Sequence, residues 1–166
     1  SSIGTTIVNE DSVLEGALEE ALAMSDEALA EKFIDGVEIT AAVLGNEEPL
    51  VLPLIEIETA KGVYDYEAKY TLGGSSHIIP ARISLEATRR VEEYSRQIYR
   101  SFKCLGFSRM DFIIDSSEKP YVLEVNNIPG MTELSLFPDA ALHYGLEYDD
   151  LVERVVKLAV DFWKVG

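Results

Sequence analysis

Two neighbouring apolar runs, joined by a short polar turn, constrain the fold more than any other feature of this 166-residue chain. The runs are Arg109-Met-Asp-Phe-Ile-Ile-Asp115 and Tyr121-Val-Leu-Glu-Val-Asn126, with Ser116-Ser-Glu-Lys-Pro120 between them. Apolar runs of this length, bounded by turn residues, predict two strands of an antiparallel pair. Side chains two residues apart share one face of a strand, so we expect Asp111, Glu124 and Asn126 to lie side by side.

The chemistry of these three side chains points to a metal site. Two carboxylates and an amide are hard oxygen ligands, which suit Mg²⁺, and Mg²⁺ in such sites usually arrives with substrate phosphates. Arg109 adds a cation to the same face, and opposite charges placed together are typical of functional sites. Gly130, after the second run, allows backbone N–H groups to approach a ligand. The plainer interpretation is that these are solvated side chains at strand ends.

Composition limits the remaining choices. The apolar fraction is 47% and the chain is long enough for one domain with a real core. The net charge of −16 argues against a nucleic-acid or anionic-membrane surface, but helix N-termini, a few cations and Mg²⁺ still allow a phosphate ligand. The lone Cys104, in a helical apolar context, is expected to be a small core residue of a cytoplasmic protein without disulfides. No apolar run reaches membrane-spanning length.

Hydrophobic periodicity predicts the order of elements. We expect helices over 12–24, with a capping box at Ser12, over 85–105, capped by Ser84, over 138–144, which carries His143 on a helix face, and over 149–163. We expect strands over 29–34, 37–44 and 50–57, with a hairpin turn at Asp35-Gly36. Loops are expected over 59–81, with His77 at the surface, and over 131–136. The sum is an α+β fold with a mainly antiparallel sheet and packed helices.

Several motifs, in order, resemble the C-terminal part of ATP-grasp ligases, specifically of D-alanine–D-alanine ligases. The matching segments are Ser1-Ser-Ile-Gly4, Glu31-Lys-Phe-Ile-Asp-Gly-Val-Glu38, Tyr64-Asp-Tyr-Glu-Ala-Lys-Tyr70, Arg109-Met-Asp111, Glu124-Val-Asn-Asn-Ile-Pro-Gly-Met-Thr132 and Ser135-Leu136. They span nearly the whole chain. The Arg-x-Asp and Glu-x-Asn pairs are typical of the superfamily, whereas Tyr66-Glu-Ala-Lys-Tyr70 and Pro129-Gly-Met-Thr132 point to this ligase.

The resemblance implies an ATP-grasp fold and an ATP-dependent ligation of two D-alanines through an acyl phosphate, for peptidoglycan precursor synthesis. It implies that Asp111, Glu124 and Asn126 hold two Mg²⁺ ions, which Mn²⁺ is able to replace. Arg109 and the Gly130 N–H would stabilise the oxyanion, and Ser135 with the Leu136 N–H would hold the carboxylate of the second D-alanine.

The resemblance also assigns the nucleotide site. Glu31, Lys32, Phe33 and Ile34 would form the adenine hinge, Glu38 would bind the ribose hydroxyls and Lys69 the γ-phosphate. Ser1, Ser2 and Gly4 would belong to the loop over the phosphates, which Tyr70 closes with Ser1. Without the resemblance, Glu38 reads as a solvated hairpin residue, Ser135 as a helix cap, and Lys69 and Tyr70 as ordinary loop residues.

By this resemblance, residues 1–58 form the adenine-hinge and ribose-binding part, 59–83 a mobile loop, and 84–166 the Mg²⁺ and substrate part. The chain begins without Met and lacks the family's N-terminal substrate domain, so it reads as a fragment with weak or no ligase activity by itself. The parent protein is expected to be a cytoplasmic homodimer. Lys69-Tyr70 favours D-alanine over D-lactate as acceptor, whereas Glu133-Leu134 departs from the usual acceptor loop. A ligase with a D-lactate or L-amino acid acceptor, and a non-catalytic nucleotide-binding module, remain as alternatives.

Overall fold

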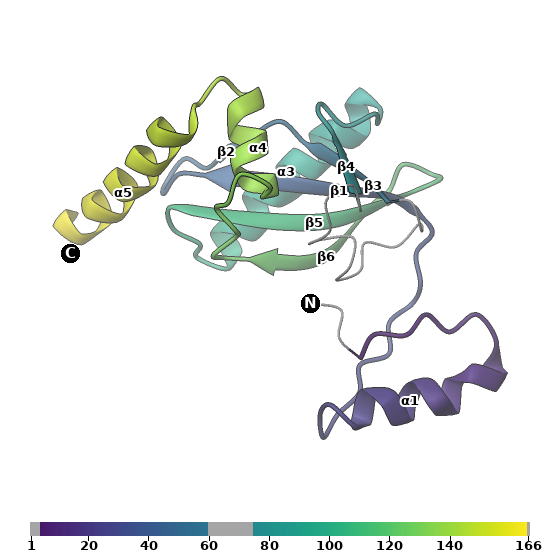
Figure 1. Ribbon diagram of the computed structural model, residues 1–166. Helices are drawn as coiled ribbons and strands as arrows, with labels where there is room; N and C mark the ends of the chain where they lie inside the picture. The colour runs from purple at the N-terminus through teal and green to yellow at the C-terminus, as the bar shows by residue number, and fades with distance from the viewer. Residues whose placement is uncertain (1–3, 60–74, 166) are drawn as a thin grey trace. The chain divides into compact units, whose positions relative to one another are not determined.

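The computed structural model describes residues 4–59 and 75–165, which fall into two compact units (Figure 1). The described part of the first unit is residues 4–34 with 59 and 75, and that of the second is residues 35–58 and 76–165. The first unit contains a 3-10 helix, η1 (Asp11–Val13), and helix α1 (Leu14–Leu22). The helix predicted over 12–24 is therefore confirmed in place, two residues shorter at its end.

The predicted capping box at Ser12 is wrong. Ser12 lies inside η1 and its hydroxyl donates to the Glu10 carboxylate at 3.4 Å, while the residue that precedes α1 is Val13, which has no side chain able to cap. A single 3-10 turn leads into the α-helix and takes the place of the cap.

The strand predicted over 29–34, and the hairpin turn at Asp35-Gly36, are also wrong. Residues 27–35 form neither helix nor strand. Leu29 and Phe33 are 83% and 60% exposed, so this apolar run is not buried in a sheet, and strand propensity without a neighbouring strand does not make a ladder. Gly36 instead begins β1. A Cβ at Gly36 would lie 2.2 Å from the Ile114 carbonyl oxygen, so only glycine allows this close approach of two strands.

The second unit is built on a six-stranded sheet in the order β4-β3-β1-β5-β6, with β2 paired to β1 (Figure 1). The strands are β1 (Gly36–Leu44), β2 (Leu50–Val51), β3 (Ile55–Thr59), β4 (Ser75–Ile78), β5 (Phe107–Asp115) and β6 (Pro120–Asn126). β1 pairs antiparallel with β2, β3 and β5, and β5 pairs antiparallel with β6. The predicted α+β class with a mainly antiparallel sheet is confirmed.

Two strand predictions need correction. The strand expected over 50–57 is split into β2 and β3, and Pro53, which has no N–H to donate to a ladder, lies in the break. The loop expected over 59–81 contains β4, which carries His77, so His77 is a strand residue. Thr59 is the last residue of β3, and residues 60–74 of that predicted loop lie outside the described residues.

Three helices complete the second unit: α3 (Leu85–Ser101), α4 (Leu136–His143) and α5 (Tyr148–Val165). The Ser84 cap is confirmed, because its hydroxyl accepts from the Ala87 N–H at 3.1 Å. α3 ends four residues earlier than predicted, so Cys104 lies beyond the helix, where it packs against the core as expected. α4 starts two residues earlier than predicted. None of the helices in the described ranges is long and apolar enough to cross a membrane.

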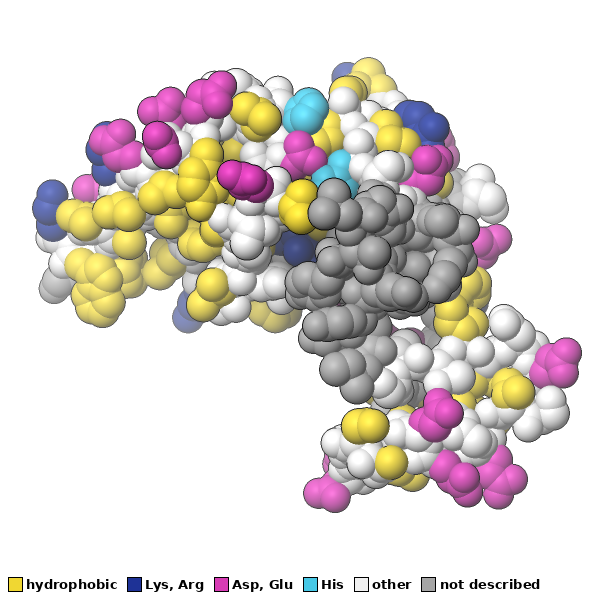
Figure 2. Space-filling model, in the orientation of Figure 1, with side chains coloured by type: hydrophobic (Ala, Val, Ile, Leu, Met, Phe, Trp, Pro, Cys, Tyr) yellow, Lys and Arg dark blue, Asp and Glu magenta, His cyan; other side chains and the backbone are white. Residues whose placement is uncertain are grey.

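The sheet separates two layers, with α3 behind it and α4 in front in Figure 1. One face carries Ile39, Ala41 and Val43 of β1 with Met110 and Phe112 of β5, and these pack with Val91 and Tyr99 of α3 into the main core. The opposite face contacts α4, where Phe107 meets Phe137 edge-on with ring centroids 5.4 Å apart. α5 packs on α4 and leaves a run of apolar side chains exposed, visible as the yellow surface at the left of Figure 2.

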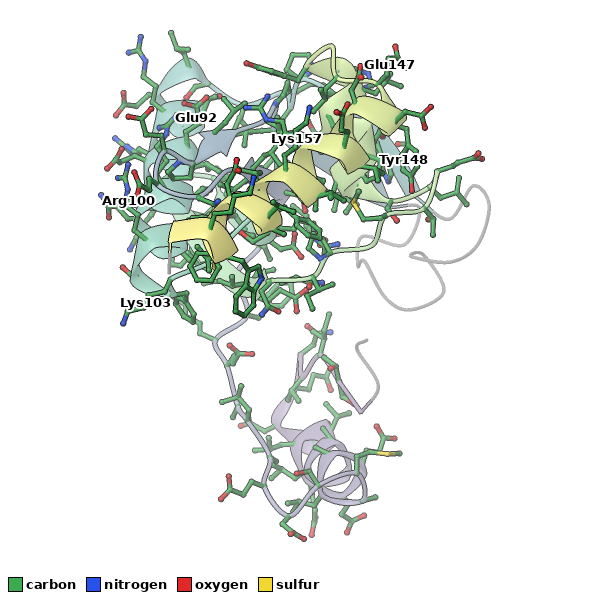
Figure 3. The ribbon with its side chains drawn as sticks, turned by 90° about the vertical axis from the view of Figure 1, so that its left-hand side faces the viewer. Glu92, Arg100, Lys103, Glu147, Tyr148 and Lys157 are labelled. Atoms are coloured by element: carbon green, nitrogen blue, oxygen red, sulfur yellow. The ribbon has the colours of Figure 1, made fainter. Side chains whose placement is uncertain are left out.

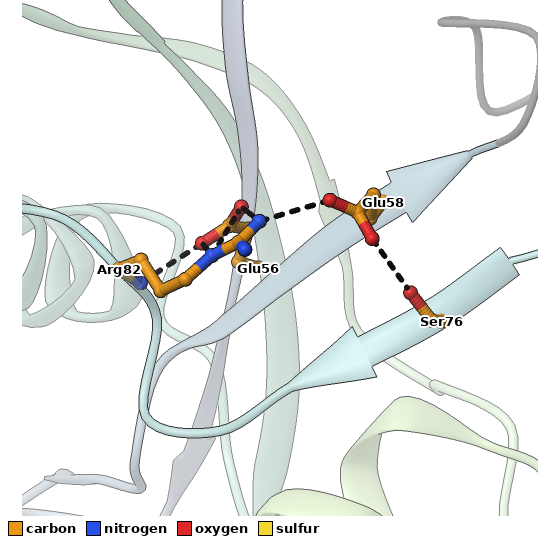
Figure 4. Close-up of polar contacts among 4 residues, drawn as sticks. All are labelled: Glu56, Glu58, Ser76 and Arg82. Atoms are coloured by element: carbon orange, nitrogen blue, oxygen red, sulfur yellow. Dashed lines mark hydrogen bonds and ion pairs between the residues drawn. The ribbon is translucent and has the colours of Figure 1, made fainter.

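An ion-pair network ties β3 to the segment that follows β4 (Figure 4). The Arg82 guanidinium donates to the Glu56 carboxylate, with Nη2 2.6 Å from Oε1, and also to Glu58 at 3.0 Å. The Arg82 backbone N–H adds a bond of 2.9 Å to Glu56. These bonds to Arg82 lower the pKa of the buried Glu56, and they explain how a carboxylate is accommodated beside the core.

Candidate functional site

The turn between β5 and β6 fixes which residues of the two strands face each other. Asp115 accepts hydrogen bonds from the Ser117 N–H, the Ser117 hydroxyl and the Lys119 N–H, at 2.8, 2.6 and 3.0 Å. The hydrogen bond from the Ser117 hydroxyl is the main reason that the pKa of Asp115 is lowered to about 2. An ionised Asp115 at neutral pH holds the turn closed, and the closed turn sets the register of the strand pair.

That register brings the predicted cluster together. Asp111 lies opposite Glu124, and Arg109 lies opposite Asn126. Because residues two apart on a strand share a face, all four side chains stand on the same face of the β5–β6 pair. The face is the one that contacts α4, away from the α3 core. The predicted side-by-side placement of Asp111, Glu124 and Asn126 is confirmed.

Asp111 is the most enclosed member of the cluster, at 6% exposure. Its Oδ1 accepts from the Thr40 hydroxyl and from Arg109 Nε at 3.0 Å, and its Oδ2 accepts from Arg109 Nη2 at 2.7 Å. A fork of this kind between a guanidinium and a carboxylate fixes both position and orientation. Asp111 is therefore presented with its carboxylate plane already set.

Arg109 bridges the two carboxylates. Its Nη2 lies 3.5 Å from Glu124 Oε1 in addition to its bonds with Asp111. The Arg109 side chain is largely buried, whereas Glu124 is half exposed. The Arg109 guanidinium thus balances part of the charge of the two carboxylates, which lie opposite each other on the strand pair and would otherwise repel.

The donor set fits a divalent cation. Asp111 and Glu124 supply carboxylate oxygens, and Asn126 supplies an amide oxygen, which here accepts from the Ile128 N–H at 3.1 Å. Within residues 4–59 and 75–165, no group of three or more His, Cys, Asp and Glu side chains is arranged to hold a metal ion without other ligands. An ion at this site would accordingly take two carboxylates and the amide from the protein and complete its shell with phosphate or water oxygens.

The loop after β6 brings Gly130 against Ser135. A Cβ at Gly130 would lie 2.8 Å from the Ser135 hydroxyl oxygen, so a larger residue would force Ser135 to shift. Ser135 is the N-cap residue of α4, as the helix-cap alternative predicts, but its side chain makes no capping hydrogen bond. Its hydroxyl instead accepts from the Thr132 N–H at 3.0 Å. Leu136 follows as the buried first residue of α4.

The first residue of α5 also contacts this loop. The hydroxyl of Tyr148, labelled in Figure 3 at the start of α5, donates to the Met131 carbonyl at 2.7 Å. The loop that carries Gly130 and Ser135 is thus tied at one point to a helix of the second unit.

The remaining predicted residues are distributed over both units. Glu38 lies on β1, half buried, two residues before Thr40 and so on the same face of the sheet as Thr40. In the first unit, Glu31–Ile34 is an irregular segment in which Glu31, Lys32 and Phe33 are exposed. Gly4 has a φ of +73°, and a Cβ there would lie 3.2 Å from Met24 Cγ. Ser1, Ser2, Lys69 and Tyr70 lie outside the described residues.

Sequence reasoning missed two features. Thr40 was not singled out, although a hydroxyl inside the apolar run of β1 is a signal that a buried partner exists. His77 was placed at the surface, yet its Nδ1 lies 2.7 Å from Asp139 Oδ2 of α4, and His143 Nδ1 lies 3.3 Å from the other oxygen of Asp139. The two histidines are the cyan side chains in Figure 2. The His77–Asp139 contact joins residues 62 positions apart and leaves no local signal, whereas the His143–Asp139 contact is an i,i+4 pair within α4.

Comparisons with known proteins identify the family of the chain. A family profile described as "D-ala D-ala ligase C-terminus" matches residues 1–157. A D-alanine–D-alanine ligase of Pelotomaculum thermopropionicum is 50% identical over 161 residues, which cover 97% of this chain and 51% of that protein. A second, from Carboxydothermus hydrogenoformans, is 50% identical over 162 residues, or 97% of this chain and 52% of that protein.

Solved structures give the same result. The VanG D-Ala:D-Ser ligase of Enterococcus faecalis superposes with a TM-score of 0.81 at 39% identity, over 95% of this chain and 46% of that one. A D-alanine–D-alanine ligase of Bacillus anthracis complexed with ATP superposes with a TM-score of 0.79 at 28% identity, over 95% of this chain and 49% of that one. The chain spans about half the length of the curated relatives that it matches. It belongs to the family of D-alanine–D-alanine ligase C-terminal regions, and its fold is the corresponding part of the ATP-grasp fold.

Proposed function

We propose that this chain supplies the nucleotide, metal and acceptor sites of an ATP-dependent D-alanine–D-alanine ligase that makes a peptidoglycan precursor. One observation carries the proposal: Arg109, Asp111, Glu124 and Asn126 stand on one face of a strand pair, with Asp111 opposite Glu124. Oxygen ligands and a guanidinium at one place suit the transfer of a phosphoryl group to a carboxylate, since that step brings two anions together.

The reaction proceeds in two steps. The carboxylate of the first D-alanine attacks the γ-phosphorus of ATP, which gives an acyl phosphate and releases ADP. The amine of the second D-alanine then attacks the acyl carbon, and the tetrahedral intermediate expels phosphate to leave the dipeptide and a proton. Two Mg²⁺ ions, or Mn²⁺ in their place, neutralise the phosphate charge when they are bound.

In this proposal Asp111, Glu124 and Asn126 are the metal ligands. Arg109 and the Gly130 N–H stabilise the oxyanion of the tetrahedral intermediate. Ser135 and the Leu136 N–H hold the carboxylate of the second D-alanine. The 2.8 Å that would separate a Gly130 Cβ from the Ser135 hydroxyl supports a role for both residues at one place.

The nucleotide is assigned to the first part of the chain. Residues 1–58 supply the adenine hinge, Glu31 to Ile34, and the ribose ligand Glu38, while residues 59–83 supply Lys69 for the γ-phosphate and Tyr70 for closing the site with Ser1. Ser2 and Gly4 contact the phosphates, and residues 84–166 supply the metal and acceptor sites. The irregular backbone of residues 27–35 supports the hinge assignment, because such backbone has N–H and C=O groups left for a base.

The protein is further proposed to act in the cytoplasm as a homodimer on small molecules, without a nucleic-acid or membrane partner. The charge of −16 supports the last point.

The acceptor has a second candidate. A D-Ala:D-Ser ligase is 39% identical to this chain, so D-serine competes with D-alanine as the second substrate. D-lactate and an L-amino acid are further acceptors to be tested, and a nucleotide-binding module without catalysis is the remaining alternative.

The test is product analysis on the longest natural chain that contains these 166 residues. The protein is incubated with ATP, Mg²⁺ and D-alanine, alone or with D-serine, D-lactate or L-alanine, and ADP and condensed products are measured by mass spectrometry. We expect D-alanyl-D-alanine from D-alanine alone, and its loss in Glu124→Ala. A mixed product that dominates at equal concentrations would reassign the acceptor. No ADP release with any acceptor, from folded protein that still binds ADP, would leave only the nucleotide-binding module.

A further inference from the structure

The polar side chain of Thr40, on β1, is fully buried. It is 0% exposed and lies between Ile39 and Ala41 on β1, a strand that is otherwise apolar from residue 39 to its end. A buried hydroxyl without a partner is costly, so a polar residue in such a place needs a specific acceptor. The acceptor is Asp111 Oδ1, which belongs to the residue directly opposite Thr40 on β5.

The contacts of Asp111 divide into two kinds. Arg109 approaches both carboxylate oxygens as a cation, at 3.0 and 2.7 Å. Thr40 approaches Oδ1 as a neutral donor from within the sheet. A divalent cation that binds Asp111 competes electrostatically with the guanidinium but not with a neutral hydroxyl. A carboxylate has about four acceptor directions, so Oδ1 keeps its bond to Thr40 while a cation uses another.

We propose that Thr40 is a positioning residue of the divalent-cation site: its hydroxyl fixes the carboxylate plane of Asp111 whether or not Arg109 remains paired with it. The inference rests on the proposed function, because it gives Asp111 a metal to bind. The observed partner of the Thr40 hydroxyl is Asp111, and Thr40 is not proposed as a metal ligand. It acts through Asp111, in the way that hydrogen-bond partners behind metal ligands usually act.

The backbone supports this role. Thr40 and Asp111 are paired in the β1–β5 ladder, which runs without a break from Gly36–Asp115 to Leu44–Phe107. The pairing of β5 with β6 is irregular just after Asp111. On both sides of Asp111 in the sequence, therefore, β5 pairs regularly with β1, whereas its register with β6 shifts there. A second anchor from β1 therefore compensates for a less regular neighbour in β6.

The test compares Thr40→Val with Thr40→Ser. Valine keeps the branched shape and removes the donor, whereas serine keeps the donor. The probe is Mn²⁺, titrated into the full chain in the presence of ADP and followed by the electron paramagnetic resonance signal of free Mn²⁺. ADP binding without metal is measured by calorimetry on the same samples. Ser95→Ala, which removes another buried hydroxyl on the α3 side of the sheet, serves as the matched control.

We expect Thr40→Val to weaken Mn²⁺ binding by roughly 10-fold or more, the range seen when partners of metal ligands are removed. Thr40→Ser and Ser95→Ala should stay within about 3-fold of the wild type, and ADP binding without metal should not change. Thermal unfolding of every variant checks that it is folded. Should Thr40→Val fail to fold, Thr40→Ala and Thr40→Ser form the replacement pair, since they differ by one hydroxyl.

The outcomes separate this inference from the proposed function. Equal Mn²⁺ affinity in Thr40→Val and in a wild type that binds Mn²⁺ would overturn the role of Thr40 alone. Equal loss in Thr40→Val and Thr40→Ser would also overturn it, because the hydroxyl would not be what matters. A folded wild type that binds ADP but no Mn²⁺ would overturn both.

Discussion

Replacement of Tyr99 by Phe should lower the stability of the second unit by a predictable amount. Tyr99 is 1% exposed, its ring belongs to the α3 core, and its hydroxyl donates to the Gly45 carbonyl at 2.5 Å. Phe keeps the ring and leaves that buried carbonyl without its donor. A lost neutral hydrogen bond with a buried partner left behind costs about 1–2 kcal/mol. For a chain of this size the melting temperature should fall by roughly 4 °C.

The same side chain gives the prediction a pH dependence. Burial raises the pKa of Tyr99 above its usual value. A group whose pKa is raised on folding contributes stability that is complete below the unfolded pKa, near ~10, and is lost as pH rises further. The wild type should thus lose up to about 1.4 kcal/mol per pH unit above ~10 that Tyr99→Phe does not lose. The two stability curves are expected to meet near pH ~11.

Urea unfolding followed by circular dichroism, at pH 7 and at steps from 9 to 11, measures both effects. Tyr94→Phe is the matched control, because Tyr94 lies on the same helix and is 40% exposed; its effect should stay within about 0.5 kcal/mol. Equal stability of Tyr99→Phe and the wild type at pH 7 would refute the assigned hydrogen bond. A gap that stays constant up to pH 11 would refute the buried, neutral state of Tyr99.

Two further substitutions test buried polar groups of the second unit. Arg82→Gln should destabilise the chain at pH 7, because it leaves the buried Glu56 without its cation. Since the pKa of Glu56 is lowered on folding, the stability contributed by the Arg82–Glu56 pair is present above the pKa of Glu56 in the unfolded chain and is lost as pH falls. The gap in urea midpoint between Arg82→Gln and the wild type should therefore narrow from pH 7 to pH 3, and an unchanged gap would contradict the pairing. Ser108→Ala should change stability by less than about 0.5 kcal/mol, since the buried Ser108 hydroxyl has no hydrogen-bond partner among the described residues. A loss above 1 kcal/mol in thermal unfolding, on the scale of a typical hydrogen bond, would mean that Ser108 has a partner.

The strand pair that carries the site could be predicted from sequence because its determinants are local. The turn of residues 116–120 lies between two apolar runs, and it brings Asp111 opposite Glu124 with little freedom to slip. The start of α3 could be predicted for the same reason, because Ser84 immediately before it is a typical N-cap residue. Fold class follows from these elements and their order.

What could not be predicted depends on residues far apart in the chain. The Thr40–Asp111 bond spans 71 residues and the His77–Asp139 bond spans 62, so neither has a local pattern. The prediction of a strand over 29–34 was wrong although its local pattern is present. These residues have strand propensity, but in the described residues no neighbouring strand pairs with them.

We propose that β5 and β6 carry a metal-dependent nucleotide site, and calorimetric titration with ADP is the measurement that decides whether they do. The chain is titrated with and without Mg²⁺, beside Glu124→Ala and the control Glu153→Ala, which alters an exposed residue of α5. We predict that Mg²⁺ tightens ADP binding to the wild type and to Glu153→Ala, and that Glu124→Ala loses this gain while remaining folded. ADP affinity that is the same with and without Mg²⁺, or a Mg²⁺ gain that survives in Glu124→Ala, would contradict a metal site at Glu124.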